Sequence, residues 1–189
     1  MVRRFFLVLS MCISGSGFAQ DHLPYAGKGL LKGSATISPG FMLSAPVTNV
    51  YVAAGLEYFL EDRISFRGEG LWSMESPQEH PLLLQNNQLA FGPFYHITEG
   101  RCDLGLGMEA GINLAWPAGA EVAVEQNAPQ LVPSASLCAH FTWAVWDYFH
   151  FFADTRYVHA RYTGSCDGAL PLDEIIVGGG LGFQFRLKK

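Results

Sequence analysis

The sequence predicts an all-β protein: a closed antiparallel eight-stranded transmembrane β-barrel that follows a cleaved signal peptide. Apolar and polar residues alternate with a period of two, and about eight such segments are long enough to cross a membrane when tilted. The connections between these segments alternate between short and long. Only 15% of the 189 residues are charged and 49% are hydrophobic, which is unusual for a soluble domain of this size.

The N-terminus has the pattern of a secretory signal peptide. Two arginines precede an apolar run over residues 5–13, and small residues end at Ala19. The run is too short to cross about 30 Å of hydrocarbon as a helix. Cys12 could carry a lipid anchor only if a small residue preceded it, and Met11 does not fit. We therefore expect a signal peptide over residues 1–19 and one barrel domain over 20–189.

Period-two alternation predicts the strands and their faces. In residues 64–75, Ile64, Phe66 and Trp72 share one face, and the opposite face is polar and charged. The same pattern predicts strands near residues 30–42, 48–60, 63–75, 86–98, 102–116, 132–146, 149–162 and 173–187. We find no helical periodicity.

The connections predict the orientation of the barrel. Those after the second, fourth and sixth strands are tight, around residues 61–62, 99–100 and 147–148. Those after the third, fifth and seventh strands are longer and rich in Pro, Gly and acidic residues. Short periplasmic turns and long outer loops are typical of outer-membrane barrels, so both termini are expected on the periplasmic side.

The apolar face carries aromatic residues at both ends of the strands. We expect two girdles at the membrane interfaces. The periplasmic girdle would contain Tyr58, Tyr95, Trp143, Phe149, Phe183 and Phe185, and the outer girdle Phe41, Trp72, Trp116 and Tyr157. The alternative is a soluble barrel or sandwich with these residues in its core. Many glycines and few charges on the opposite face favour a narrow lumen instead.

The last strand, from Val177 to Phe185, is glycine-rich and ends in alternating aromatic residues. With the signal peptide and the eight alternating segments, it resembles small outer-membrane β-barrels of the OmpA-like and OmpX-like porin family. Members typically end at an aromatic residue, whereas residues 186–189 follow here.

The resemblance implies an outer-membrane location in a Gram-negative cell envelope. It implies contact with outer-membrane lipids and lipopolysaccharide, insertion by the barrel-assembly machinery, and a monomer. The implied role is non-enzymatic: structural, surface-interaction or minor porin-like. The alternatives are a lipid A deacylase-like hydrolase and a soluble periplasmic lipocalin-like binding barrel.

A set of charged residues is predicted to face the lumen. It comprises Glu57, Arg67, Glu69, Glu109, Asp154, Arg156 and Arg186. Buried charges must pair, and an eight-stranded barrel leaves a lumen only wide enough for side chains. Ion pairs that fill the lumen are the favoured interpretation, and a selective polar channel is the alternative.

The case for catalysis rests on His159 and the acids Asp173 and Glu174. The lipid A deacylase family has a His, a Ser two residues later and a downstream acid. Here Arg161 takes the place of the Ser, so the nucleophile is missing, and Thr163 and Ser165 lie too far along the chain. We expect no catalytic residue, and we expect the acids of the outer loops, Asp173 and Glu174 included, to form a solvated rim.

We expect no metal ion, cofactor or disulfide. Cys138 and His140 share a strand face, but His96 lies near another rim and a tetrahedral site needs more ligands. Cys102, Cys138 and Cys166 are predicted too far apart to bridge. The formal net charge of −5 and the lack of a large basic cluster argue against nucleic-acid binding.

Overall fold

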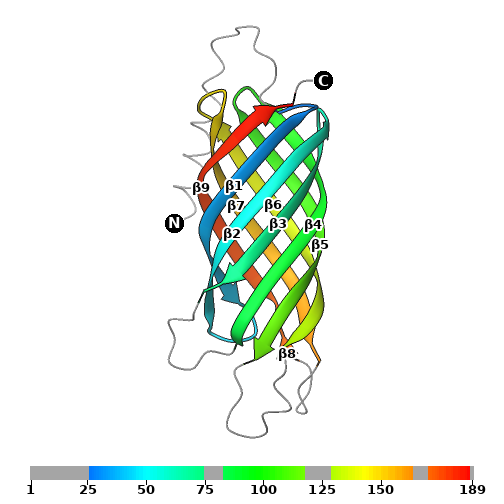
Figure 1. Cartoon of the computed structure of the whole chain (residues 1–189), viewed down its shortest axis with the longest axis vertical. Coiled ribbons are helices and arrows are strands. Elements are labelled where there is room, and N and C mark those ends of the chain that lie inside the picture. Colours follow the sequence, from blue (N-terminus) through cyan, green and yellow to red (C-terminus); the bar gives the residue numbers. More distant parts are fainter. Residues whose placement is uncertain (1–25, 75–82, 118–128, 164–169, 188–189) are drawn as a thin grey trace, which may run out of the picture.

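A computed structural model describes residues 26–74, 83–117, 129–163 and 170–187. These residues form a tilted barrel (Figure 1). Its strands are β1 (Leu30–Met42), β2 (Thr48–Glu61), β3 (Ile64–Ser73), β4 (Leu83–Glu99), β5 (Cys102–Pro117), β6 (Gln130–Ala144), β7 (Phe149–Tyr162), β8 (Leu170–Pro171) and β9 (Glu174–Arg186). None of the described residues belongs to a helix long and apolar enough to cross a membrane. The predicted signal peptide lies outside the described residues.

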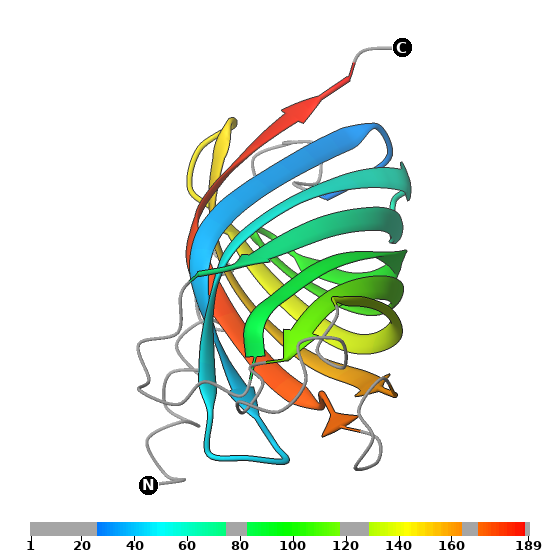
Figure 2. The same ribbon diagram turned by 60° about the horizontal axis from the view of Figure 1, so that its bottom comes forward.

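Eight long antiparallel strands close into a ring, which Figure 2 shows from the loop end. Each strand from β1 to β7 pairs with the next, β7 pairs with β9, and β9 pairs with β1. Closure is direct, because Leu31 lies opposite Tyr58 on β2 and Phe185 on β9. The predicted eight-stranded barrel is confirmed.

Differences from the predicted strands are small. The largest is at β4, which begins at Leu83 and not at residue 86. The short β8 was not predicted, and it pairs with the end of β7 at Arg161 and Tyr162. A two-residue strand has no periodicity that a sequence pattern can detect.

The two ends of the barrel differ. The tight-turn end carries the connections after β2, β4 and β6, together with the end of β9 (Figure 1). The loop end carries the connections after β1, β3, β5 and β7, and the last three of these include residues outside the described ranges. This alternation agrees with the predicted orientation.

Apolar side chains cover the outside of the barrel, and the charged and polar side chains of the strands point inward together with buried apolar ones. The outward residues of β5, such as Leu106, Met108 and Ile112, are exposed, whereas the inward Asp103 and Glu109 are buried. All ten residues of the two predicted girdles lie exposed on the outside. An apolar exterior that surrounds the whole barrel is favourable against lipid. The interior is filled by charged and polar as well as apolar side chains, which does not fit a lipocalin-like barrel with an open apolar cavity.

A charge on the outer face tests this orientation. Met108 lies near the middle of β5 and Leu131 at the loop end of β6, and their exposed fractions are nearly equal, 65% and 66%. Met108→Arg is expected to lower the free energy of unfolding by about 2–4 kcal/mol, and Leu131→Arg by about 0–1 kcal/mol, because the cost depends on membrane depth. Urea unfolding in lipid vesicles measures both. Equal costs would contradict the membrane position.

Candidate functional site

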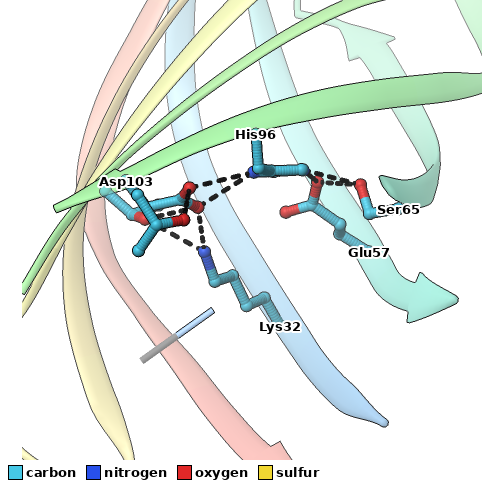
Figure 3. A network of polar contacts seen from close by, with 7 residues as sticks. Lys32, Glu57, Ser65, His96 and Asp103 are labelled. Atoms are coloured by element: carbon cyan, nitrogen blue, oxygen red, sulfur yellow. Dashed lines mark hydrogen bonds and ion pairs between the residues drawn. The ribbon is translucent and has the colours of Figure 1, made fainter. Parts of the chain in front are cut away.

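The barrel interior is the candidate site, and its first polar layer lies near the tight-turn end (Figure 3). Lys32 of β1 crosses the lumen and donates to Asp103 Oδ2 of β5 at 2.7 Å and to Thr142 Oγ1 at 3.0 Å. Lys32 and Asp103 are both buried, so this ion pair is shielded from water. Thr98 Oγ1 also donates to Asp103, at 2.9 Å.

His96 joins Asp103 to Glu57 (Figure 3). Its Nδ1 lies 3.0 Å from Asp103 Oδ2, and its Nε2 lies 3.1 Å from Glu57 Oε1. Ser65 Oγ lies 2.8 Å from the same Nε2 and donates to Glu57 Oε1 at 2.6 Å. We name Lys32, Glu57, Ser65, His96, Asp103 and Thr142 the His96 network.

The sequence of contacts from Ser65 through His96 to Asp103 is that of a hydrolase triad, but its surroundings are not. Ser65 and His96 are 0% exposed. The Ser65 hydroxyl also donates to Glu57, so its proton is shared with a carboxylate that a triad does not have. Ser65 is therefore enclosed within the barrel and is not presented at its surface.

The second layer lies near mid-barrel. Arg67 of β3 donates to Glu69 at 2.9 Å, and Arg156 of β7 contacts Glu69 and, at 2.6 Å, Glu109 of β5. Cys138 points inward and donates to Glu109 Oε2 at 3.4 Å. The predicted pairing of interior charges is confirmed for these two arginines and two glutamates.

Two other predicted lumen residues differ from this pattern. Asp154 is only half-buried. Arg186 lies on the same face of β9 as the buried Gln184, as predicted, but it is exposed because it is the last residue of the strand.

The third layer lies toward the loop end around Glu174. Its carboxylate accepts hydrogen bonds from Asn49 Nδ2 and Tyr51 OH, each at 2.8 Å, and Asn86 Nδ2 donates to Tyr51 OH at 3.0 Å. Placing Glu174 on a solvated rim was wrong. Glu174 is the first residue of β9. The alternation of inward and outward residues along β9 begins with it, so its side chain points inward.

His159 and Asp173 do meet, outside the lumen. His159 Nδ1 lies 2.7 Å from Asp173 Oδ1, and the His159 side chain is 60% exposed. The cross-strand neighbour of His159 on β6 is Ala135. Among the hydrogen bonds and ion pairs of the described residues, the partner of His159 is Asp173, and no hydroxyl group takes part. Ser165 lies outside those ranges.

Apolar clusters close both ends of the lumen. At the tight-turn end, Phe59 packs with Ala26 and Leu30, and its ring centroid lies 4.4 Å from that of His96. At the loop end, inward side chains of several strands and of the segment after β8 form a larger cluster: Met42, Leu83, Ala115, Val132, Ala160, Tyr162 and Leu172. Leu172 N donates to Ala160 O at 2.8 Å, which holds that segment across the mouth.

Interior glycines make room for the larger side chains. A Cβ at Gly105 would lie 2.9 Å from the His96 ring, and one at Gly107 would lie 2.6 Å from the Phe94 ring. Gly182 lies beside His150 in the same way. These three glycines leave the volume that a neighbouring aromatic or histidine ring occupies, which is one reason why the polar face carries glycines.

Lys32 was not predicted as a lumen residue, and His96 was predicted only near a rim. The signal for Lys32 was available, since Ser34, Thr36 and Ser38 continue its polar face along β1. Cys138 and His140 belong to no group of three metal-ligating side chains within the described part of the chain. Cys166 lies outside that part.

Comparison with known proteins identifies the fold. No family model and no curated protein sequence matches the chain. Neisserial surface protein A is 10% identical with a TM-score of 0.58, covering 84% of this chain and 96% of that chain. OprG from Pseudomonas aeruginosa is 11% identical with a TM-score of 0.59, covering 86% and 98%.

Ail, the attachment invasion locus protein of Yersinia pestis, is 14% identical with a TM-score of 0.52, covering 85% and 99%. At these identities the likeness concerns the fold alone. The chain has the fold of the small outer-membrane β-barrel proteins.

The buried ion pair across the lumen should matter far more than an exposed one. Lys32→Ala is expected to lower the free energy of unfolding by about 3–5 kcal/mol, because it leaves Asp103 without its cation in a buried site. Lys28→Ala removes the pair with Glu61, whose side chains are both exposed, and should cost at most about 1 kcal/mol. Urea unfolding in detergent micelles compares them. Similar costs would contradict the structural role of the His96 network.

The space beside the interior glycines gives a matched pair of variants on β9. Gly182→Ala places its Cβ against His150 and 2.7 Å from Gly33 O, and it should destabilise the barrel by about 1–3 kcal/mol through overpacking. Gly180→Ala meets Phe152 at an ordinary 3.4 Å and should be close to neutral. The same unfolding assay measures both, and equal effects would show that the interior is loosely packed.

Proposed function

We propose that this chain is a non-enzymatic outer-membrane barrel that acts as a rigid, closed scaffold for its outer loops, and that solutes do not pass through it. The observation that carries the proposal is the filled lumen. Three polar layers lie between an apolar cluster at the tight-turn end and a larger one at the loop end.

The outer-membrane location is supported by the exterior and by the fold. The outward face is apolar, aromatic rings surround both ends, and the compared barrels are outer-membrane or surface proteins by name. We propose that outer-membrane lipids and lipopolysaccharide surround the barrel and that the barrel-assembly machinery inserts it. A monomer fits the closed ring, which leaves no long unpaired strand edge.

A surface-interaction role fits a scaffold of this kind better than transport. Two of the compared proteins are named as a surface protein and as an attachment invasion locus protein. For this chain we propose the same general task, contact with molecules outside the cell through the connections at the loop end. The closed lumen supports this role because a filled barrel holds the loop bases in fixed positions.

Measurement of ion conductance tests whether the lumen is closed to solutes. The chain folded in detergent and inserted into planar lipid bilayers is expected to give no stepwise current above that of the bare bilayer. Folding is checked beforehand by the shift in gel mobility between heated and unheated samples. Reproducible single-channel steps from folded protein would overturn the scaffold and favour the porin-like role.

Lipid A hydrolysis is the second candidate, because His159 and Asp173 form a contact on the outer face. The described contacts of His159 include no nucleophile, so we expect no acyl release from lipopolysaccharide by the wild type or by His159→Ala. Mass spectrometry of the lipid measures this. Release that is lost in His159→Ala and kept in Lys28→Ala would establish the hydrolase.

A further inference from the structure

A small cavity lies inside the barrel beside the His96 network. Its volume is about 10 Å³. The cavity is lined by residues of β1, β2, β3, β6 and β7, among them Lys32, Gly55, Glu57, His140 and His150. A volume of this size accommodates about one water molecule and excludes an organic ligand.

Three side chains at this cavity carry polar atoms without a hydrogen-bond partner among the described residues. These atoms are Glu57 Oε2, His140 Nδ1 and both ring nitrogens of His150. All three side chains are more than nine-tenths buried. A buried polar group without a partner costs about 1–3 kcal/mol, and more when it is charged, so native proteins rarely keep several at one place.

The histidine rings are held at this place by packing. The Phe152 ring centroid lies 5.9 Å from that of His140 and 6.4 Å from that of His150. Gly182 leaves the space for the His150 ring, because a Cβ there would overlap it. Rotation of either histidine ring toward another hydrogen-bond partner would therefore disturb its packing against Phe152.

We propose that one ordered water molecule occupies this cavity and bridges Glu57 to His140 and His150. A carboxylate oxygen only accepts hydrogen bonds, so its partner must be a donor. An imidazole nitrogen donates or accepts according to its tautomer, so water satisfies both kinds of group. An anion would face the Glu57 carboxylate. Within the described ranges, no three ligating side chains are placed to hold a metal ion.

The water would extend the His96 network. That network joins β1, β2, β3, β4, β5 and β6 through Lys32, Glu57, Ser65, His96, Asp103 and Thr142. A water between Glu57 and the two histidines would add a second link to β6 and the first to β7. This inference is independent of the proposed function, since a barrel of any role could contain the site.

Gly55→Ala is the sharpest variant for the test. Gly55 lines the cavity, and its added Cβ would meet protein atoms no closer than 3.5 Å, at Gly68 O. Without a water there, the methyl group would fill space and restrict the unfolded chain, so the urea midpoint would stay level or rise. With the water, the methyl group displaces it and leaves Glu57 Oε2 without a donor, so the midpoint should fall.

The control is Gly180→Ala, which adds the same methyl group at an inward glycine away from the cavity lining. The expected result is a lower midpoint for Gly55→Ala than for Gly180→Ala. A crystal structure of the wild-type barrel should also show one electron-density peak within hydrogen-bond distance of Glu57 Oε2. Two outcomes would overturn the proposal: no peak in the cavity, or an anomalous peak after a bromide soak, which would assign the site to a small anion.

Discussion

The rest of this structure depends on ion pairs that cross the lumen between opposite strands. In the ring of eight long strands, β5 lies fourth from β1 in either direction, and β7 lies fourth from β3. Lys32 and Asp103 join the first of these opposite pairs, and Arg156 and Glu69 join the second. The two links hold the barrel cross-section along two different diameters, which backbone ladders between neighbouring strands do not do.

These links explain the division between the two faces of each strand. Charges inside a narrow barrel cost little only when they pair, and pairing across the lumen needs long side chains facing small ones. Glycine opposite a ring, as at Gly105 and His96, supplies the small partner. The lipid-facing side uses the same device, because the Phe91 ring covers Gly68 and the Phe183 ring covers Gly33.

The strands and their faces were predictable because a period of two is local and repeats over ten or more residues. The predicted set of interior charges was also largely right, as Arg67, Glu69 and Arg156 show. Partners were not predictable: Lys32 and Thr142 are 110 residues apart and meet only through the ring closure. Residues at strand ends were the weak point. Glu174 was assigned to a solvated rim although the predicted strand over residues 173–187 already contained it, and Arg186 has the predicted face but is exposed at the last position of β9.

The opposite-strand links also constrain how such a chain reaches its final state. Until β9 pairs with β1, the strands form an open sheet without a lumen. In that sheet Lys32 and Arg156 are far from Asp103 and Glu69, so these ion pairs cannot form. An open sheet in hydrocarbon would hold these charges alone, at a cost of several kcal/mol each. Insertion and ring closure must therefore proceed together. The charged side chains of partly closed intermediates must stay hydrated until the last strand pair forms.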